Sequence, residues 1–79
     1  MINSPRQQIA LAGFNAGDTD MLLSVYNSVS SSYSNPSAQI RAAILGAVVD
    51  MAGIGTRAPA KIAAYAIHRA RFIADGAAR

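Results

Sequence analysis

Apolar residues recur in this chain at the three- and four-residue spacing of an α-helix. A weak repeat carried by Ile9, Ala12 and Ala16 predicts a short first helix over residues 5–15. A stronger repeat predicts a second helix over residues 19–33. Its apolar stripe consists of Met21, Leu22, Val25, Tyr26, Val29 and Tyr33. Because serine and asparagine occupy the other face, we expect this helix to bury one side only.

A wider apolar surface is predicted for the third helix, over residues 38–52. Its central stripe consists of Ile40, Ile44, Ala47, Val48 and Met51, and Leu45 and Val49 widen it. The neighbouring positions are mostly alanine, leucine, valine and glycine, so the apolar arc extends around much of the helix. Such a helix should lie at the centre of a fold or in a subunit interface. Its many small residues leave room for another backbone to approach closely.

The fourth helical pattern covers residues 57–75 and has two distinct sides. The apolar side consists of Ile62, Ala66, Ala70 and Ile73. The opposite side is basic and consists of Arg57, Lys61, His68 and Arg71. Tyr65 and Phe72 lie at the border between the two sides, where aromatic residues at helical spacing usually form the edge of a core. The alternative is that these two rings stack on the bases of a single nucleic-acid strand.

Capping residues indicate where the helices begin. Ser4 followed by Pro5 is typical of a helix N-terminus, because serine caps the first turn and proline fits the first helical position. Ser37 has the corresponding place before the third helix. We expect Asp18 or Asp20 to cap the second helix, since aspartate is also a good N-cap.

Glycines indicate where the helices end. Gly17 and Gly53 are expected to end the first and third helices, and Ile54 is placed to fold back on the last turn of the third. Thr56 would then cap the fourth helix. This arrangement puts Pro59 at the third helical position, where a missing N–H costs little.

These elements together predict an all-α fold, a small bundle of about four helices in a single domain over residues 1–79. A single core of this size gives a net stability of only roughly 3–5 kcal/mol. The chain has no cysteine to form disulfides, so self-association is the remaining means of adding stability. No secretory leader or membrane-spanning run is recognisable in the sequence. We therefore expect a soluble, cytoplasmic protein.

Charge divides the chain into two halves. Residues 1–50 contain two arginines and three aspartates, whereas residues 51–79 contain five lysines and arginines and one aspartate. The formal net charge of the whole chain is +3 at pH 7. A basic half favours an acidic partner, which is a nucleic acid, an anionic membrane surface or an acidic protein patch. The alternative is that the basic side of the fourth helix only faces water.

Catalytic and metal-binding chemistry has little support in the sequence. The single histidine, His68, lies among basic residues, and the next carboxylate along the chain is Asp75. One histidine and no cysteine exclude a multi-histidine or thiolate metal site within one chain. Asp18 and Asp20 lack the further ligands of an EF-hand loop. We therefore assign no catalytic, metal-binding or cofactor-binding residue, and we expect the protein not to be an enzyme.

Residues 49–62 have the spacing of a helix-turn-helix. Gly53 stands at the turn, Ile54 follows it, and Ile62 comes nine positions after the glycine. The segment resembles the DNA-binding motif of many bacterial repressors. It departs from that motif at Val49 and Pro59, where a smaller residue and an aliphatic residue are usual. The resemblance implies that four residues would lie near the major groove of DNA and that two arginines would point toward its phosphates. The residues near the groove would be Thr56, Arg57, Ala60 and Lys61, and the arginines near phosphates would be Arg69 and Arg71.

The interpretation favoured by the sequence is a non-enzymatic helical module that binds other proteins and associates with itself. Such a module would act as an adaptor, an assembly subunit or a small inhibitor, and it also fits a phage or mobile-element product. The candidates for the core or a self-association interface are Ile40, Ile44, Val48 and Met51. The candidates for binding a partner are Arg57, Lys61, His68 and Arg71.

Two other functions remain open at this stage. The first is a small DNA-binding regulator that uses a degenerate helix-turn-helix at residues 49–62 and the basic fourth helix. The second is binding to a membrane surface. It ranks third, because the apolar side of the fourth helix is mostly alanine and gives a weak anchor.

Overall fold

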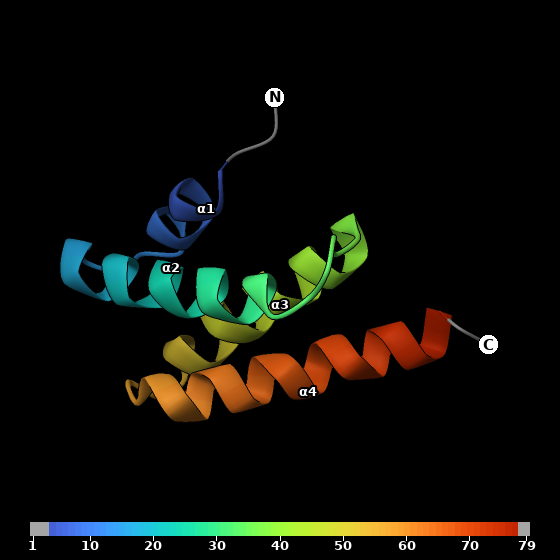
Figure 1. Cartoon of the computed structure of the whole chain (residues 1–79). Helices are drawn as coiled ribbons and strands as arrows, with labels where there is room; N and C mark the ends of the chain where they lie inside the picture. Colours follow the sequence, from blue (N-terminus) through green and yellow to red (C-terminus); the bar gives the residue numbers. More distant parts are fainter. Residues whose placement is uncertain (1–3, 78–79) are drawn as a thin grey trace.

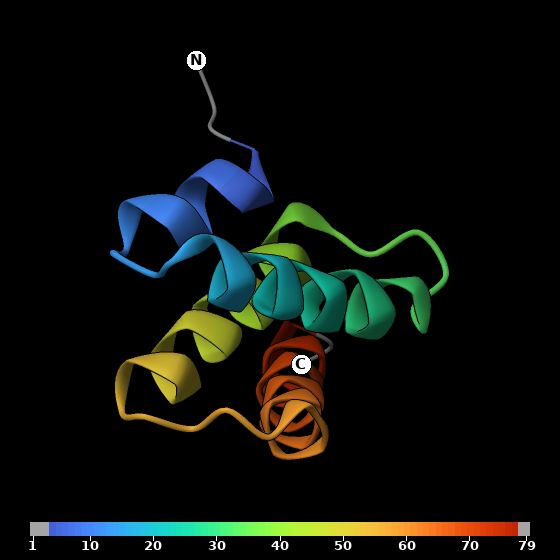
Figure 2. The ribbon, with the colours of Figure 1, turned by 90° about the vertical axis from the view of Figure 1, so that its left-hand side faces the viewer.

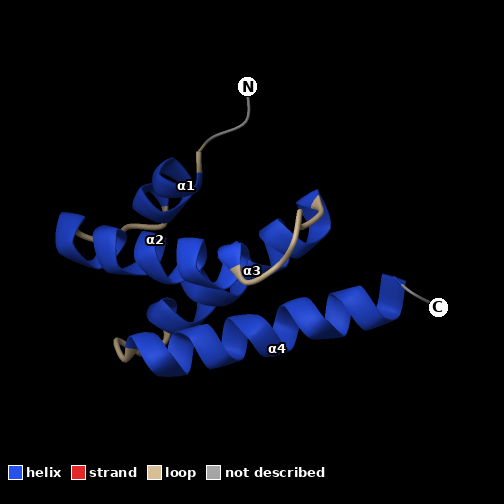
Figure 3. Ribbon diagram, viewed as in Figure 1, coloured by secondary structure: helices blue, strands red, loops and turns tan. Residues whose placement is uncertain are grey.

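The computed structural model describes residues 4–77, with residues 75–77 described by their backbone alone. Its helices are α1 (Pro5–Leu11), α2 (Ala16–Ser31), α3 (Ala38–Gly53) and α4 (Pro59–Ala77). Figure 1 shows α2 lying across α3, with α1 on one side of this pair and α4 on the other. Throughout the described residues the only regular secondary structure is helical (Figure 3). The predicted all-α fold of about four helices is therefore confirmed.

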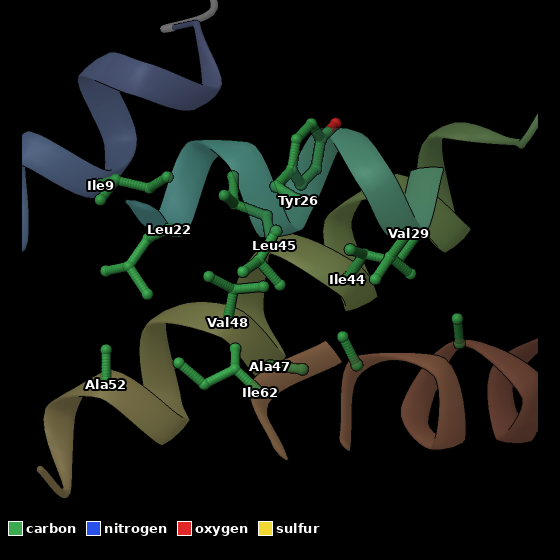
Figure 4. Packing of buried hydrophobic residues seen from close by; sticks show 13 residues of the cluster. Ile9, Leu22, Tyr26, Val29, Ile44, Leu45, Ala47, Val48, Ala52 and Ile62 are labelled. Carbon is green, nitrogen blue, oxygen red and sulfur yellow. The ribbon is translucent and has the colours of Figure 1, made fainter. Parts of the chain in front are cut away.

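The central helix is α3. It packs against α2 and, most extensively, against α4. Its fully or almost fully buried residues are Ile44, Leu45, Ala47, Val48 and Ala52. In Figure 4, Val48 lies between Leu45 and Ile62, and Ile44 lies beside Val29 of α2. The middle of the apolar arc that the sequence predicts is thus buried inside a single copy of the chain, whereas Val49 at its edge is only half-buried.

Several of the buried residues of α3 and α4 are alanines. Ala47 and Ala52 of α3, together with Ala66 and Ala70 of α4, are each at most 2% exposed. A methyl side chain keeps neighbouring backbones close, and such tightly packed interiors have little space for extra atoms. Ile62 supplies the one large, fully buried side chain on this side of α4.

Ala66→Leu should therefore destabilise the protein, by about 1–3 kcal/mol, because the added carbons force α4 away from its neighbours. The matched control is Ala64→Leu, since Ala64 is exposed on the same helix. That variant should change the free energy of unfolding by less than about 0.5 kcal/mol. Urea unfolding of both variants makes the comparison. Equal stabilities would mean that the interface has room for a larger side chain.

Two of the helices begin at the predicted caps. The Ser4 Oγ accepts a hydrogen bond from the Gln7 N–H at 3.2 Å, and Gln7 Oε1 accepts one from the Ser4 N–H at 2.9 Å. This reciprocal pair is a capping box. Ser37 caps α3 by accepting from the Ile40 N–H at 3.2 Å.

Within residues 4–77, none of these helices has the length and apolar character needed to cross a bilayer.

The first helix is shorter than the sequence suggests. It ends at Leu11 instead of continuing to residue 15, because Gly13 takes a φ of +98°. That backbone conformation favours glycine and cannot continue a right-handed helix. The chain therefore turns at Gly13. Gly17, which was expected to end the first helix, lies inside the first turn of α2.

Asn15, rather than Asp18 or Asp20, caps α2. Its Oδ1 accepts a hydrogen bond from the Asp18 N–H at 2.7 Å. Asparagine and aspartate are about equally good N-caps, so residue type alone does not distinguish the three candidates. As a result, the carboxylates of Asp18 and Asp20 are available for ion pairs with arginines.

The turn after α3 differs from the expectation in its details. The helix ends at Gly53, and Gly55 takes a φ of +100°. The Gly55 N–H donates to the Ala52 carbonyl at 3.0 Å, and the Thr56 N–H donates to the Met51 carbonyl at 3.1 Å. This pair of bonds is a Schellman motif, which satisfies the last carbonyl groups of a helix.

The predicted roles of Ile54 and Thr56 are wrong. Ile54 is 79% exposed and does not fold back on α3. Thr56 does not cap α4, because that helix begins three residues later, at Pro59. Proline is suited to the first helical position, where its fixed φ is helical and its missing N–H would have no partner within the helix.

Candidate protein-binding surfaces

Three ion pairs connect different parts of the fold. They are Arg6–Asp20 at 2.7 Å, Arg57–Asp18 at 3.1 Å and Arg69–Asp50 at 2.7 Å. All three lie at the surface, so each adds at most about 1 kcal/mol of stability. Their larger effect is on the distribution of charge. Among the side chains that the structure describes, every aspartate has an arginine partner, and the remaining charges are positive.

Arg57 holds together three segments of the chain. Its Nε donates to Asp18 Oδ2 at 3.1 Å, and its Nη1 donates to the carbonyls of Ala52 at 2.6 Å and Thr56 at 3.0 Å. Its guanidinium also lies 5.4 Å from the centre of the Phe14 ring, within cation–π distance. A positive charge beside the last carbonyls of α3 complements the helix dipole.

These contacts correct the placement of Arg57 made from the sequence. The residue precedes α4, so it does not belong to the basic side of that helix. Its contact with Asp18 joins positions 39 residues apart. A long-range contact of this kind leaves no mark in the local spacing of residues.

The outward side of α4 combines positive charge with exposed apolar groups. We call it the α4 outer face, and it consists of Lys61, Ile67, His68, Arg71 and Phe72. Lys61, His68 and Arg71 are exposed and form no ion pair with any side chain that the structure describes. Phe72 is 73% exposed and Ile67 is 38% exposed. Phe72 thus lies outside the core edge at which the sequence analysis placed it.

Arg69 is directed toward α3 instead of toward solvent. Its Nη1 donates to Asp50 Oδ2 at 2.7 Å, and its guanidinium lies 5.8 Å from the centre of the half-buried Tyr65 ring. The hydrogen bond to the Asp50 carboxylate raises the pKa of Arg69 above its usual value. Arg69 therefore serves to join α4 to α3.

The predicted core and interface candidates divide into two groups. Ile44 and Val48 are fully buried, whereas Ile40 and Met51 are half-buried and pack against the edge of the core. Of the residues that the helix-turn-helix resemblance directs to DNA, Arg57 and Arg69 are engaged in contacts within the fold. Three others, Ala60, Lys61 and Arg71, remain exposed.

An apolar groove lies between α1 and α3. It has two adjoining parts of about 360 and 290 Å³, which share Gln8, Ala42 and Leu45. The groove exists because α1 packs against α2 and makes no substantial interface with α3. Figure 2 shows α1 and α4 on opposite sides of the α2–α3 pair, so the groove is remote from the α4 outer face.

Besides Gln8, two polar side chains line this groove, Arg41 and Tyr26. The sequence placed Tyr26 in the apolar stripe of the second helix and gave Arg41 no role. Arg41 stands at the exposed rim, and Tyr26 is only 8% exposed. The only sequence signal was the group of small residues Ala42, Ala43, Gly46 and Ala47. That group indicated a close approach of another backbone without saying which backbone it was.

Comparison of the chain with protein-family models, curated proteins and solved structures finds no match. In the part of the chain described, no group of three or more histidine, cysteine, aspartate and glutamate side chains is placed to hold a metal ion. The described part of the molecule thus has two candidate binding surfaces, the α4 outer face and the α1–α3 groove.

Proposed function

We propose that this chain is a non-enzymatic helical module that binds an acidic surface of another protein through the α4 outer face. One observation carries the proposal. A single side of α4 presents unpaired positive charge beside a phenylalanine that is 73% exposed. Arginine and aromatic residues are enriched at protein interfaces, where a few such residues provide most of the binding energy.

The sign of the charge indicates the kind of partner. Among the described side chains, the aspartates are already paired with arginines, and Lys61 and Arg71 have no carboxylate partner. Carboxylates on another protein would supply one. A second copy of the chain would bring the same positive charges to this face, and like charges across an interface are repulsive. Self-association through α3 has a weaker motive than the sequence suggested, because the middle of its apolar arc is buried within one copy.

Binding to duplex DNA is less well supported than binding to an acidic protein. Contacts of lysine and arginine with phosphates supply essentially all of the non-specific affinity of a protein for DNA. In the described part of the chain, only Arg41, Lys61 and Arg71 are guanidinium or ammonium groups without an ion pair. Three such contacts would give a log–log salt dependence of only about −2.7. Arg41 lies on a different helix from the other two, which reduces the number that one duplex can contact.

The proposal predicts charge-selective binding at the α4 outer face. The probe is a synthetic helical peptide with alternating leucine and glutamate pairs, and its counterpart with lysine in place of glutamate is the control. The glutamate peptide should perturb the NMR signals of residues 61–72, and the lysine peptide should not. Lys61→Ala combined with Arg71→Ala should weaken binding about tenfold or more, because both attractive charges are lost.

Arg41→Gln is the matched control for this double variant, since it removes a positive charge from a different surface. It should leave the perturbation of residues 61–72 unchanged. Equal binding of both peptides, or binding of random duplex DNA with a steeper salt dependence than three contacts allow, would contradict the proposal.

A further inference from the structure

The groove between α1 and α3 has the shape and chemistry of a site for a helix. Its floor follows α3 from Ala38 to Val49, a distance of about 16 Å or three helical turns. Small residues at Ala42 and Gly46 let an approaching helix come close to the backbone of α3. The groove is open along its length, so it can cover one face of a helix but not most of a small molecule.

The Tyr26 hydroxyl is an unused hydrogen-bonding group at this groove. The side chain is more than nine-tenths buried, and its hydroxyl forms no hydrogen bond with any residue that the structure describes. Figure 4 shows the hydroxyl at the outer end of the ring, turned away from Val48 and Ile62. The hydroxyl oxygen is not among the buried side-chain atoms that lack a partner, so it is in contact with solvent at the groove and can bond a ligand atom there.

Arg41 gives the groove its charge. It lines the same part of the groove as Tyr26, and within the described residues it has no ion-pair partner. A guanidinium and a phenol are both good donors to a carboxylate, and hydrogen bonds to a charged group are stronger than neutral ones. An apolar floor with these two donors beside it matches an apolar stripe flanked by an acidic residue.

We propose that the α1–α3 groove binds an amphipathic helix of a partner protein, with an aspartate or glutamate of that helix bound by Arg41 and Tyr26. This mode is the laying of a helix into an apolar groove, with anchors at i, i+4 and i+7. The inference does not rest on the α4 outer face. The two surfaces are remote from each other, so one copy of the chain can hold two partners at once.

The test uses the full chain and a synthetic helical peptide with leucine at i, i+4 and i+7 and one glutamate beside this stripe. A second peptide has glutamine instead of the glutamate. The first peptide should perturb the NMR signals of α1 and of residues 38–49. Its affinity should fall about tenfold in Arg41→Gln and severalfold in Tyr26→Phe. The glutamine peptide should bind more weakly and should not distinguish these variants from the parent.

Gly46→Leu supplies a variant that fills the groove without harming the fold. A Cβ at this position meets no atom within 4 Å, and leucine favours a helix more than glycine does. We expect this variant to be at least as stable as the parent and to lose peptide binding. Loss of binding therefore cannot be attributed to unfolding.

Three results would overturn the proposal. The first is that the glutamate peptide binds Gly46→Leu as tightly as it binds the parent and perturbs the NMR signals of residues 61–72. That result would place the peptide on the α4 outer face and would leave the α4 proposal intact. The second is equal binding of the two peptides, which removes the role of the carboxylate. The third is a dimer of the parent chain that Gly46→Leu converts to a monomer in sedimentation, which makes a second copy the occupant.

Discussion

Ile44→Ala should remove about 2–4 kcal/mol from the free energy of unfolding. Ile44 is fully buried on α3, beside Val29 of α2 in the core. Truncation removes three buried carbons and leaves a cavity that rigid neighbouring helices fill only in part. Since a domain of this size has only roughly 3–5 kcal/mol of net stability, the variant should be unfolded to a large extent at room temperature.

Ile54→Ala is the matched control for this experiment, because it makes the same chemical change at a position that is 79% exposed. Its free energy of unfolding should stay within about 0.5 kcal/mol of the parent. Urea unfolding followed by circular dichroism compares the two variants. Similar stabilities would show that the stripe containing Ile44 does not form the core.

Arg57→Ala should destabilise the protein by about 1–3 kcal/mol, more than any other removal of a charged side chain. The surface ion pair with Asp18 contributes little of this, because both groups are partly exposed and screened by solvent. Most of the loss comes from the hydrogen bonds to the carbonyls of Ala52 and Thr56, which a charged donor makes strong. The cation–π contact with Phe14 adds to it.

Arg41→Ala is the control for Arg57→Ala, since it removes an arginine that has no partner in the described part of the fold. Thermal unfolding at low and high salt makes the comparison. The Arg57 effect should persist in high salt, because hydrogen bonds to neutral carbonyls are screened less than an ion pair between two charges. A loss that disappears in high salt would assign the whole effect to Asp18.

The helices could be predicted from the sequence because each depends on local information. The stripes of residues 19–33 and 38–52 require only that apolar residues share one side of a helix. The caps at Ser4 and Ser37 depend on residues within the next turn. The junction of α1 and α2 was mispredicted for the same local reason, since Gly13 and Gly17 are equally able to end a helix until the fold selects one.

The candidate surfaces were predictable to different degrees. The exposure of Lys61 and Arg71 follows from the burial of Ile62 on the other side of the same helix. The helical repeat of this one segment was therefore enough to predict that exposure. The role of Arg57 requires knowing that Asp18 approaches it from α2. The α1–α3 groove exists because α1 and α3 do not pack closely against each other. That is a property of the tertiary packing and not of any single segment of the sequence.

The buried alanines of α3 and α4 also have an entropic consequence. Alanine has no side-chain rotamers to lose, whereas fixing a leucine or isoleucine costs about 0.5–1 kcal/mol in conformational entropy. Ala47, Ala52, Ala66 and Ala70 therefore bury their methyl groups with no ordering penalty of this kind. The stabilisation from the small area that these residues bury is opposed only by the ordering of the backbone. This compensates in part for the small number of large side chains in the core of so short a chain.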